Sequence, residues 1–164
     1  MYSLTFLLLD NRLIHMNRHF EENNFAGSHF CLHTFPSPGA LVEFINDNDP
    51  VEAVPQSASR ACYIFRLTDG RMAGTCGISK RNAIPQEDIT REVREGFALD
   101  IGWIDELPMT NEFCVVAEET ADGLSIITAF PGSHARPFAQ KSQPKDVYML
   151  NRQFWEEHVL LKKK

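Results

Sequence analysis

The chain has 164 residues, of which 43% are hydrophobic and 23% are charged, and its formal net charge is −6. This length predicts one domain with a sizeable buried core. A protein that coats duplex nucleic acid over its whole surface is normally basic, so the acidic balance argues against that class, although it leaves room for one local basic pocket.

The chain shows no sequence signal for a membrane span or for a metal site. The apolar stretch SLTFLLLDN near the start is too short for a span or for an ordinary signal peptide. The four cysteines have neither a CxxC motif nor zinc-like spacing, so we expect buried thiols. We expect no cofactor, no membrane partner, and a location in the cytoplasm or in the cytosol of a target cell.

The first third of the chain has the periodicity of helices. NRLIHMNRHFEENN predicts a helix with Asp10 or Asn11 as its cap and Gly27 as its terminator. PGALVEFINDND predicts a second helix, which Ser37 and Pro38 would open.

The middle of the chain changes to an alternating pattern. ACYIFRL and RMAGTCGIS flank Thr68-Asp69-Gly70, and an Asp-Gly pair between such segments predicts a β-hairpin. IPQEDITREVREG, with Ile89 and Val93 four residues apart, predicts an inserted helix. ALDIGWI, EFCVVAEE and LSIITAF predict strands, the last two joined by a turn that ends at Gly123.

The order of these elements predicts an α+β fold in a single domain, residues 1–164. N-terminal helices in residues 10–50 precede a mostly antiparallel four- to five-stranded sheet with an inserted helix in residues 60–139. The tail NRQFWEEHVLLKKK predicts a C-terminal helix within an extension of residues 141–164.

Two histidines of the first predicted helix are candidate functional residues. His15 and His19 have the spacing of the zinc-binding pair in the HExxH motif, but Met16 stands where that motif requires glutamate. No third ligand is marked by spacing, so we expect no metal. The histidines are either ordinary surface residues or an acid–base pair, because imidazole can both take and give a proton near neutral pH.

Further candidates lie at the ends of predicted strands. Lys80 and Arg81 are either solvated charges or a clamp for a phosphate. Thr128 is either a simple β-former or a ligand contact, and His134 and Arg136 follow it within a few residues. Neither a GxSxG elbow nor a phosphate-binding glycine loop before a helix occurs, and no cysteine lies close to a histidine in a nucleophile motif.

Two segments together resemble a known family. LIHMNRHFEENN followed by FPSPGALVEFI is similar to the helical start of bacterial toxin and phage nuclease domains. YIFRL…GTCGIS and FCVVAEETADGLSIITAFPG resemble their sheet. The chain thus resembles the barnase/EndoU/colicin/RelE-like class of small metal-independent ribonucleases over most of residues 10–139, and IITAFPG is the most specific part.

The resemblance implies RNA cleavage by transesterification, in a toxin or effector domain. A base takes the proton of the ribose 2′-OH, which attacks the adjacent phosphate, and an acid protonates the leaving 5′ oxygen. The implied catalytic residues are His15, His19 and Thr128. The implied phosphate-binding residues are Lys80, Arg81, His134 and Arg136. The implied partners are RNA, with tRNA as one candidate, and a cognate inhibitor protein.

A second function remains open because the chain is acidic, whereas members of this class are often basic. A non-catalytic acidic protein-binding module, such as an immunity or inhibitor-like protein, would use its charge to bind a basic partner. Replacement of His19 should abolish activity in a ribonuclease, whereas a binding module should show affinity that falls with salt.

Overall fold

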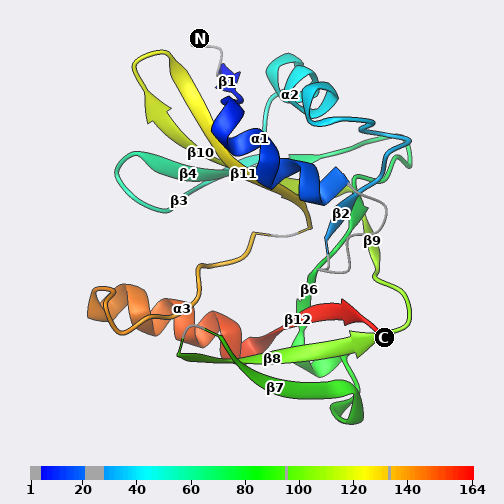
Figure 1. The fold of residues 1–164 in the computed structure, drawn as a ribbon, viewed down its shortest axis with the longest axis vertical. Helices are drawn as coiled ribbons and strands as arrows, with labels where there is room; N and C mark the ends of the chain where they lie inside the picture. Colours follow the sequence, from blue (N-terminus) through cyan, green and yellow to red (C-terminus); the bar gives the residue numbers. More distant parts are fainter. Residues whose placement is uncertain (1–4, 21–27, 95, 133) are drawn as a thin grey trace. The chain divides into compact units, whose positions relative to one another are not determined.

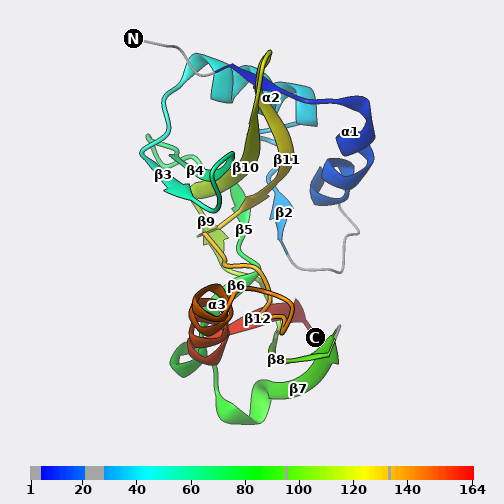
Figure 2. The same cartoon turned by 90° about the vertical axis from the view of Figure 1, so that its left-hand side faces the viewer.

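The computed structural model describes residues 5–20, 28–94, 96–132 and 134–164, and in these ranges the chain has an α+β fold. Its contacts divide the chain into two compact units, each shown with its helices and strands in Figure 1 and Figure 2. The described residues of unit 1 are 5–20, 28–75, 108–132 and 134, and those of unit 2 are 76–94, 96–107 and 135–164. The single domain expected from the length stays a prediction.

Unit 1 is built on a five-stranded sheet with the order β1-β11-β10-β4-β3. The strands are β1 (Phe6–Leu7), β3 (Glu52–Pro55), β4 (Arg60–Arg66), β10 (Glu112–Thr120) and β11 (Gly123–Pro131). β10 pairs antiparallel with β11 on one side and with β4 on the other, whereas β1 pairs parallel with β11. The predicted strands EFCVVAEE and LSIITAF and the turn between them are confirmed.

Helices of unit 1 follow the predicted order. The first is α1 (Asp10–Asn17), continued by a 3₁₀ turn, η1 (Arg18–Phe20), and the rest of that predicted helix and Gly27 lie outside the described residues. The second is α2 (Pro38–Asp47), and its predicted cap is confirmed because the Ser37 hydroxyl accepts a hydrogen bond from the Ala40 amide at 3.2 Å. A small sheet, in the order β2-β5-β9, joins β2 (His29–Phe30), β5 (Gly74–Thr75) and β9 (Met109–Thr110).

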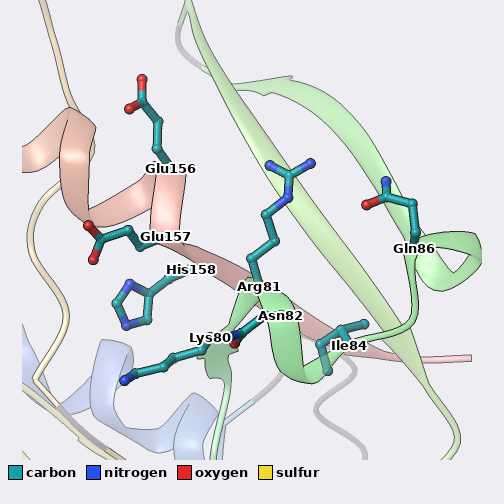
Figure 3. A pocket seen from close by; sticks show the side chains of 8 residues that line it. All are labelled: Lys80, Arg81, Asn82, Ile84, Gln86, Glu156, Glu157 and His158. Carbon is teal, nitrogen blue, oxygen red and sulfur yellow. The ribbon is translucent and has the colours of Figure 1, made fainter.

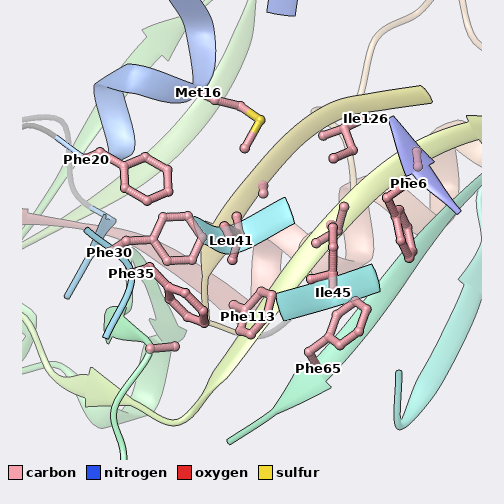
Figure 4. Close-up of a cluster of buried hydrophobic side chains, with 14 of the residues drawn as sticks. Phe6, Met16, Phe20, Phe30, Phe35, Leu41, Ile45, Phe65, Phe113 and Ile126 are labelled. Carbon is pink, nitrogen blue, oxygen red and sulfur yellow. The ribbon is translucent and has the colours of Figure 1, made fainter. Parts of the chain in front are cut away.

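The main core of unit 1 lies between one face of the large sheet and the two helices. Alternation along β10 places Phe113, Val115 and Ala117 on this face, and all three side chains are buried. Phe113 stacks on Phe65 with ring centroids 5.2 Å apart. The helices contribute other members of the same cluster, including Met16, Leu41 and Ile45 (Figure 4). Burial of these apolar side chains fixes α1 against the sheet.

A β-bulge interrupts the alternation of β11. Val116 is the register partner of Thr128, whereas the next residue of β10, Ala117, is the partner of Ile126. Ile127 is therefore one extra residue in β11. A bulge redirects the side chains next to it, so the directions of Thr128 and of the residues before it cannot be obtained by counting along a regular strand.

Unit 2 contains a four-stranded sheet with the order β6-β12-β8-β7 and one helix. The strands are β6 (Ile78–Lys80), β7 (Ile89–Arg94), β8 (Phe97–Ile104) and β12 (His158–Lys163), and the helix is α3 (Lys145–Glu157). Two 3₁₀ turns, η2 (Arg81–Ala83) and η3 (Gln86–Asp88), follow β6. None of the helices in the described ranges is long and apolar enough to cross a membrane.

The predicted inserted helix at residues 84–96 is wrong, because the chain forms η3 and the strand β7 there. Ile89 and Val93 are four residues apart, and residues four apart share one face of a helix and also one face of a strand. Pairing with β8 decides between the two, and the positive φ of 80° at Gly96 allows the tight return.

Two other predicted elements differ from the structure. Asp69 and Gly70 form a turn with positive φ angles of 61° and 73°, but β4 pairs with β3 and β10, while β5 pairs with β2 and β9. The hairpin prediction was therefore wrong. The C-terminal helix ends at Glu157, and the last residues of the predicted helix form β12, which pairs parallel with β8.

Candidate active site

The helix α1 and the strand β11 bring two of the predicted catalytic residues into contact in unit 1. The Nε2 atom of His15 lies 3.2 Å from the Oγ1 atom of Thr128, which is hydrogen-bond distance. His15 projects from the exposed side of α1, whereas Met16, the next residue, is fully buried in the core. The buried neighbour anchors α1 and so holds the His15 ring over β11.

His19 is the third member of this cluster. Its ring centroid lies 6.0 Å from that of His15, and the two planes are inclined by 76°. The Nδ1 atom of His19 lies 2.9 Å from the carbonyl oxygen of Ser28 and 3.4 Å from the hydroxyl of the same residue. A carbonyl oxygen only accepts hydrogen bonds, so the shorter contact places the proton on Nδ1 and leaves the lone pair on Nε2.

The surroundings of His19 favour its neutral form. Burial lowers the pKa of His19 below its ordinary value of 6.5, because desolvation penalises the charged imidazolium. The hydrogen bond to Ser28 opposes this effect, whereas the nearby charges of His15, His29 and Arg18 add to it. His19 is therefore a neutral imidazole at pH 7 with one nitrogen able to accept a proton.

This arrangement is suited to proton transfer near an anionic group. It combines one exposed imidazole in contact with a hydroxyl and one half-buried neutral imidazole whose ring centroid lies 6.0 Å from that of the first. Arg18 adds positive charge near His19. Among the residues that the structure describes, no group of three His, Cys, Asp or Glu side chains is arranged to hold a metal ion.

Three of the predicted phosphate-binding residues belong to unit 2. Arg81 forms an ion pair with Asp100, and Arg136 donates a hydrogen bond from Nε to the Asn151 side-chain oxygen at 2.8 Å. Lys80 is exposed at the end of β6. Their role in phosphate binding stays a prediction, whereas His15, His19 and Thr128 all belong to unit 1.

His134, the fourth predicted phosphate-binding residue, lies in unit 1 beside a pair of buried thiols. Hydrogen bonding from the Cys114 thiol lowers the pKa of Cys62 to about 6 against the opposing effect of burial, and His134 lowers it further. The Sγ atom of Cys114 also lies 3.3 Å from the carbonyl oxygen of Gly132, so this acceptor and Cys62 compete for the single S–H proton. The buried Nδ1 atom of His134 has no hydrogen-bond partner among the described residues.

Sequence reasoning missed this thiol–imidazole cluster and the carbonyl that orients His19. Cys62 and Cys114 lie on the same face of neighbouring strands, because Val116 faces Cys62 and Cys114 faces Ile64 in the register. The proximity of the two cysteines could have been predicted if the pairing of β4 with β10 had been known. A backbone carbonyl such as that of Ser28 leaves no signal in the residue type.

No family model matches the sequence, no curated protein matches it, and no solved structure matches the fold. The function is therefore inferred from the chemistry of the site itself.

Proposed function

We propose that the chain is a metal-independent endoribonuclease that cleaves RNA by attack of the ribose 2′-OH on the adjacent phosphate. The observation that carries the proposal is the contact of His15 with Thr128, with His19 at 6.0 Å from His15 between ring centroids. Two imidazoles at this spacing can each reach a different oxygen of one phosphodiester. The nucleophile belongs to the substrate, so the protein has to supply only position and proton transfer.

His19 is the general base of the proposed reaction. Its neutral ring accepts the 2′-OH proton on Nε2, since Nδ1 already donates to the Ser28 carbonyl. The bond between the 2′ oxygen and phosphorus then forms. Fixation of Nδ1 also orients the ring, so that less conformational freedom is lost when the substrate binds.

His15 is the general acid. Its exposed ring donates a proton to the 5′ oxygen as the bond between that oxygen and phosphorus breaks. The products are a 2′,3′-cyclic phosphate and a 5′-hydroxyl. The hydroxyl of Thr128 accepts from the protonated Nε2 of His15 and keeps its own hydrogen to donate to a non-bridging phosphate oxygen.

Local charge supports RNA binding despite the net charge of −6. Arg18 contributes positive charge near His19. A site that holds one or two nucleotides needs only such a local field, whereas a protein that follows a long duplex needs a basic surface. The expected substrate is therefore a single-stranded or loop segment of RNA, with tRNA as one candidate.

The test is incubation of the purified protein with total RNA and with tRNA in EDTA, followed by analysis of the cleaved ends. We expect cyclic-phosphate and 5′-hydroxyl ends, and a loss of activity of about 10²- to 10⁴-fold in His15→Ala and in His19→Ala, the usual contribution of a general acid or base. His33→Ala, at an exposed histidine of the same unit, is the matched control and should remain fully active.

Intact RNA with the wild-type protein would contradict the proposal. That result would favour the acidic protein-binding module, whose affinity for a basic partner should fall as salt is added. Cleavage that is abolished by EDTA would contradict the metal-independent mechanism.

A further inference from the structure

Unit 2 contains a pocket of about 570 Å³ that the candidate active site does not use. Its lining includes Lys80, Arg81 and His158, and Figure 3 shows these side chains with the other lining residues. The volume lies within the range of roughly 300–1,000 Å³ that is typical of pockets for small organic ligands. The pocket therefore has room for a molecule the size of a nucleotide.

His158 has a fixed orientation in this pocket. Its Nδ1 atom donates to the carbonyl oxygen of Phe154 at 2.8 Å, and its ring stacks on that of Phe154 with centroids 4.0 Å apart and planes inclined by 10°. Because Nδ1 carries the proton for this bond, Nε2 is the nitrogen left for a ligand. A ring held on two sides loses little freedom when a ligand binds.

Lys80 is the cation nearest to His158 in the strand register. The two residues are Cα partners in the antiparallel pair of β6 and β12, which places their side chains on the same face of the sheet. Lys80 is exposed, and no ion pair of the described residues includes it. Its ammonium group is therefore available to an anion.

Most other charges of the pocket are paired, whereas the carboxylate of Glu157 forms no ion pair among the described residues. The buried carboxylate of Asp100 is shared by Arg81 and Arg91, so two positive charges meet one negative charge. Glu156 is paired with Arg152, whose Nε atom lies 2.8 Å from it. Within the described part of the chain, the carboxylate of Glu157 accepts one long hydrogen bond of 3.4 Å from Gln153, so it can accept further hydrogen bonds from hydroxyl groups.

We propose that this pocket binds a nucleoside monophosphate, with its phosphate between the Lys80 ammonium group and Nε2 of His158. One proton between Nε2 and a phosphate oxygen is required, and either partner can carry it, because a phosphomonoester has its second pKa near 6. Glu157 accepts from the sugar hydroxyls. The amides of Asn82 and Gln86, which also line the pocket, both donate and accept and so match the edge of a base.

This site goes beyond the proposed ribonuclease and does not depend on it. The test is calorimetric titration of the full chain with AMP, and separately with adenosine, ribose 5-phosphate and inorganic phosphate. We expect AMP to bind at least tenfold more tightly than each of the other three. Lys80→Met and His158→Gln should each weaken AMP binding at least tenfold.

Two controls keep the test specific. Lys163→Met removes another exposed lysine of the same sheet and should leave AMP affinity unchanged, as should His15→Ala and His19→Ala. Thermal unfolding of each variant shows whether it is folded, and Lys80→Met removes only an exposed side chain. The proposal is overturned if AMP does not bind at millimolar concentration, if inorganic phosphate binds equally well, or if folded Lys80→Met keeps its affinity. Loss of AMP binding in His15→Ala would also overturn it, because the nucleotide would then belong to the other site.

Discussion

Nε2 of His15 and Oγ1 of Thr128 lie 3.2 Å apart although 113 positions separate the two residues in the sequence. If this contact belongs to an active site, Thr128→Val should lower kcat/KM for RNA cleavage roughly 10²-fold, the size expected for one positioned hydrogen-bonding group. Valine keeps the β-branched shape of threonine, so the strand should persist.

The contributions of the Thr128 hydroxyl and of the Thr128 side-chain shape to activity can be measured separately. Thr128→Ser should retain most of the activity, and Ser125→Ala, on the same strand, should retain all of it. Activity is measured with a fluorogenic RNA oligonucleotide, alongside thermal unfolding of each variant. Equal activity of wild type and Thr128→Val would show that the contact has no catalytic role.

The lowered pKa of His19 predicts the acidic limb of the pH–rate profile. The proposed base must be neutral, so activity should fall on acidification with a midpoint below 6.5. The matching measurement is an NMR titration of the His19 imidazole, which should give the same midpoint. A titration midpoint at or above 6.5 would contradict the effect of burial.

The same shift makes stability depend on pH. Below 6.5 the unfolded chain binds the His19 proton more readily than the folded chain, so the free energy of unfolding should fall as pH drops from 6.5 toward the folded pKa. Above pH 6.5 His19 is neutral in both the folded and the unfolded state, so this loss of stability vanishes. Urea unfolding of wild type and His19→Gln should be measured between the folded pKa and pH 6.5. The free energy of unfolding should depend less on pH in the variant.

Cys62 should act in the same direction along the pH scale as His19, but over a higher pH range. Its pKa is lowered from 9.0 to about 6 in the folded chain, chiefly by the Cys114 thiol. The folded state therefore favours the thiolate, and this stabilisation is complete above pH 9.0 and is lost as pH falls through about 6. The free energy of unfolding should rise with pH in that window in wild type, and less so in Cys62→Ser.

The thiolate itself can be followed by its ultraviolet absorbance. The difference between wild type and Cys62→Ser should titrate near pH 6, and Cys114→Ala should move that titration to higher pH. Cys76→Ser is the control, since Cys76 lies outside this cluster and its removal should leave the titration unchanged. A titration near 9.0 in wild type would refute the assignment.

In unit 2, the buried Asp100 is expected to be the charged residue whose loss costs most stability. Asp100→Ala leaves Arg81 and Arg91 without their shared carboxylate, and we expect a loss of about 1–3 kcal/mol in the free energy of unfolding. This loss is smaller than for a fully buried ion pair because the Arg91 side chain is 63% exposed. Asp105→Ala, at an exposed position, should change stability by less than about 0.5 kcal/mol in the same urea experiment.

The elements that could be predicted are those in which local signals agree with the tertiary structure. Ser37 and Pro38 mark the start of α2 by a cap and a proline, and the sequence carries both features. The strands β10 and β11 are long, apolar and joined by a turn that ends at Gly123. Their sequences leave little alternative to a buried hairpin.

The elements that could not be predicted are decided by partners far away in the sequence. Residues 89–94 have an apolar spacing that suits both a helix and a strand, and only pairing with β8 makes them a strand. The C-terminal residues His158–Lys163 form a strand because β6 and β8 flank them on either side. Neither choice is visible in a short window of sequence.

Part of the candidate site could be predicted from the sequence. The helical spacing of His15 and His19 already places the two rings one turn apart. Their relation to Thr128 came only from a resemblance, since no local rule joins a helix to a strand more than a hundred residues later. The proximity of Cys62 and His134 could not be predicted from the sequence, because it depends on the folded sheet and on the loop that follows it.

The extra residue at Ile127 makes the length of β11, as well as its composition, part of the candidate site. Removal of that single residue would restore a regular strand, which would turn the threonine hydroxyl out of reach of α1 while the apolar core positions beyond it are kept in step. Deletion of Ile127 should therefore abolish the proposed RNA cleavage while the protein stays folded, an outcome that substitutions at the same position would seldom produce.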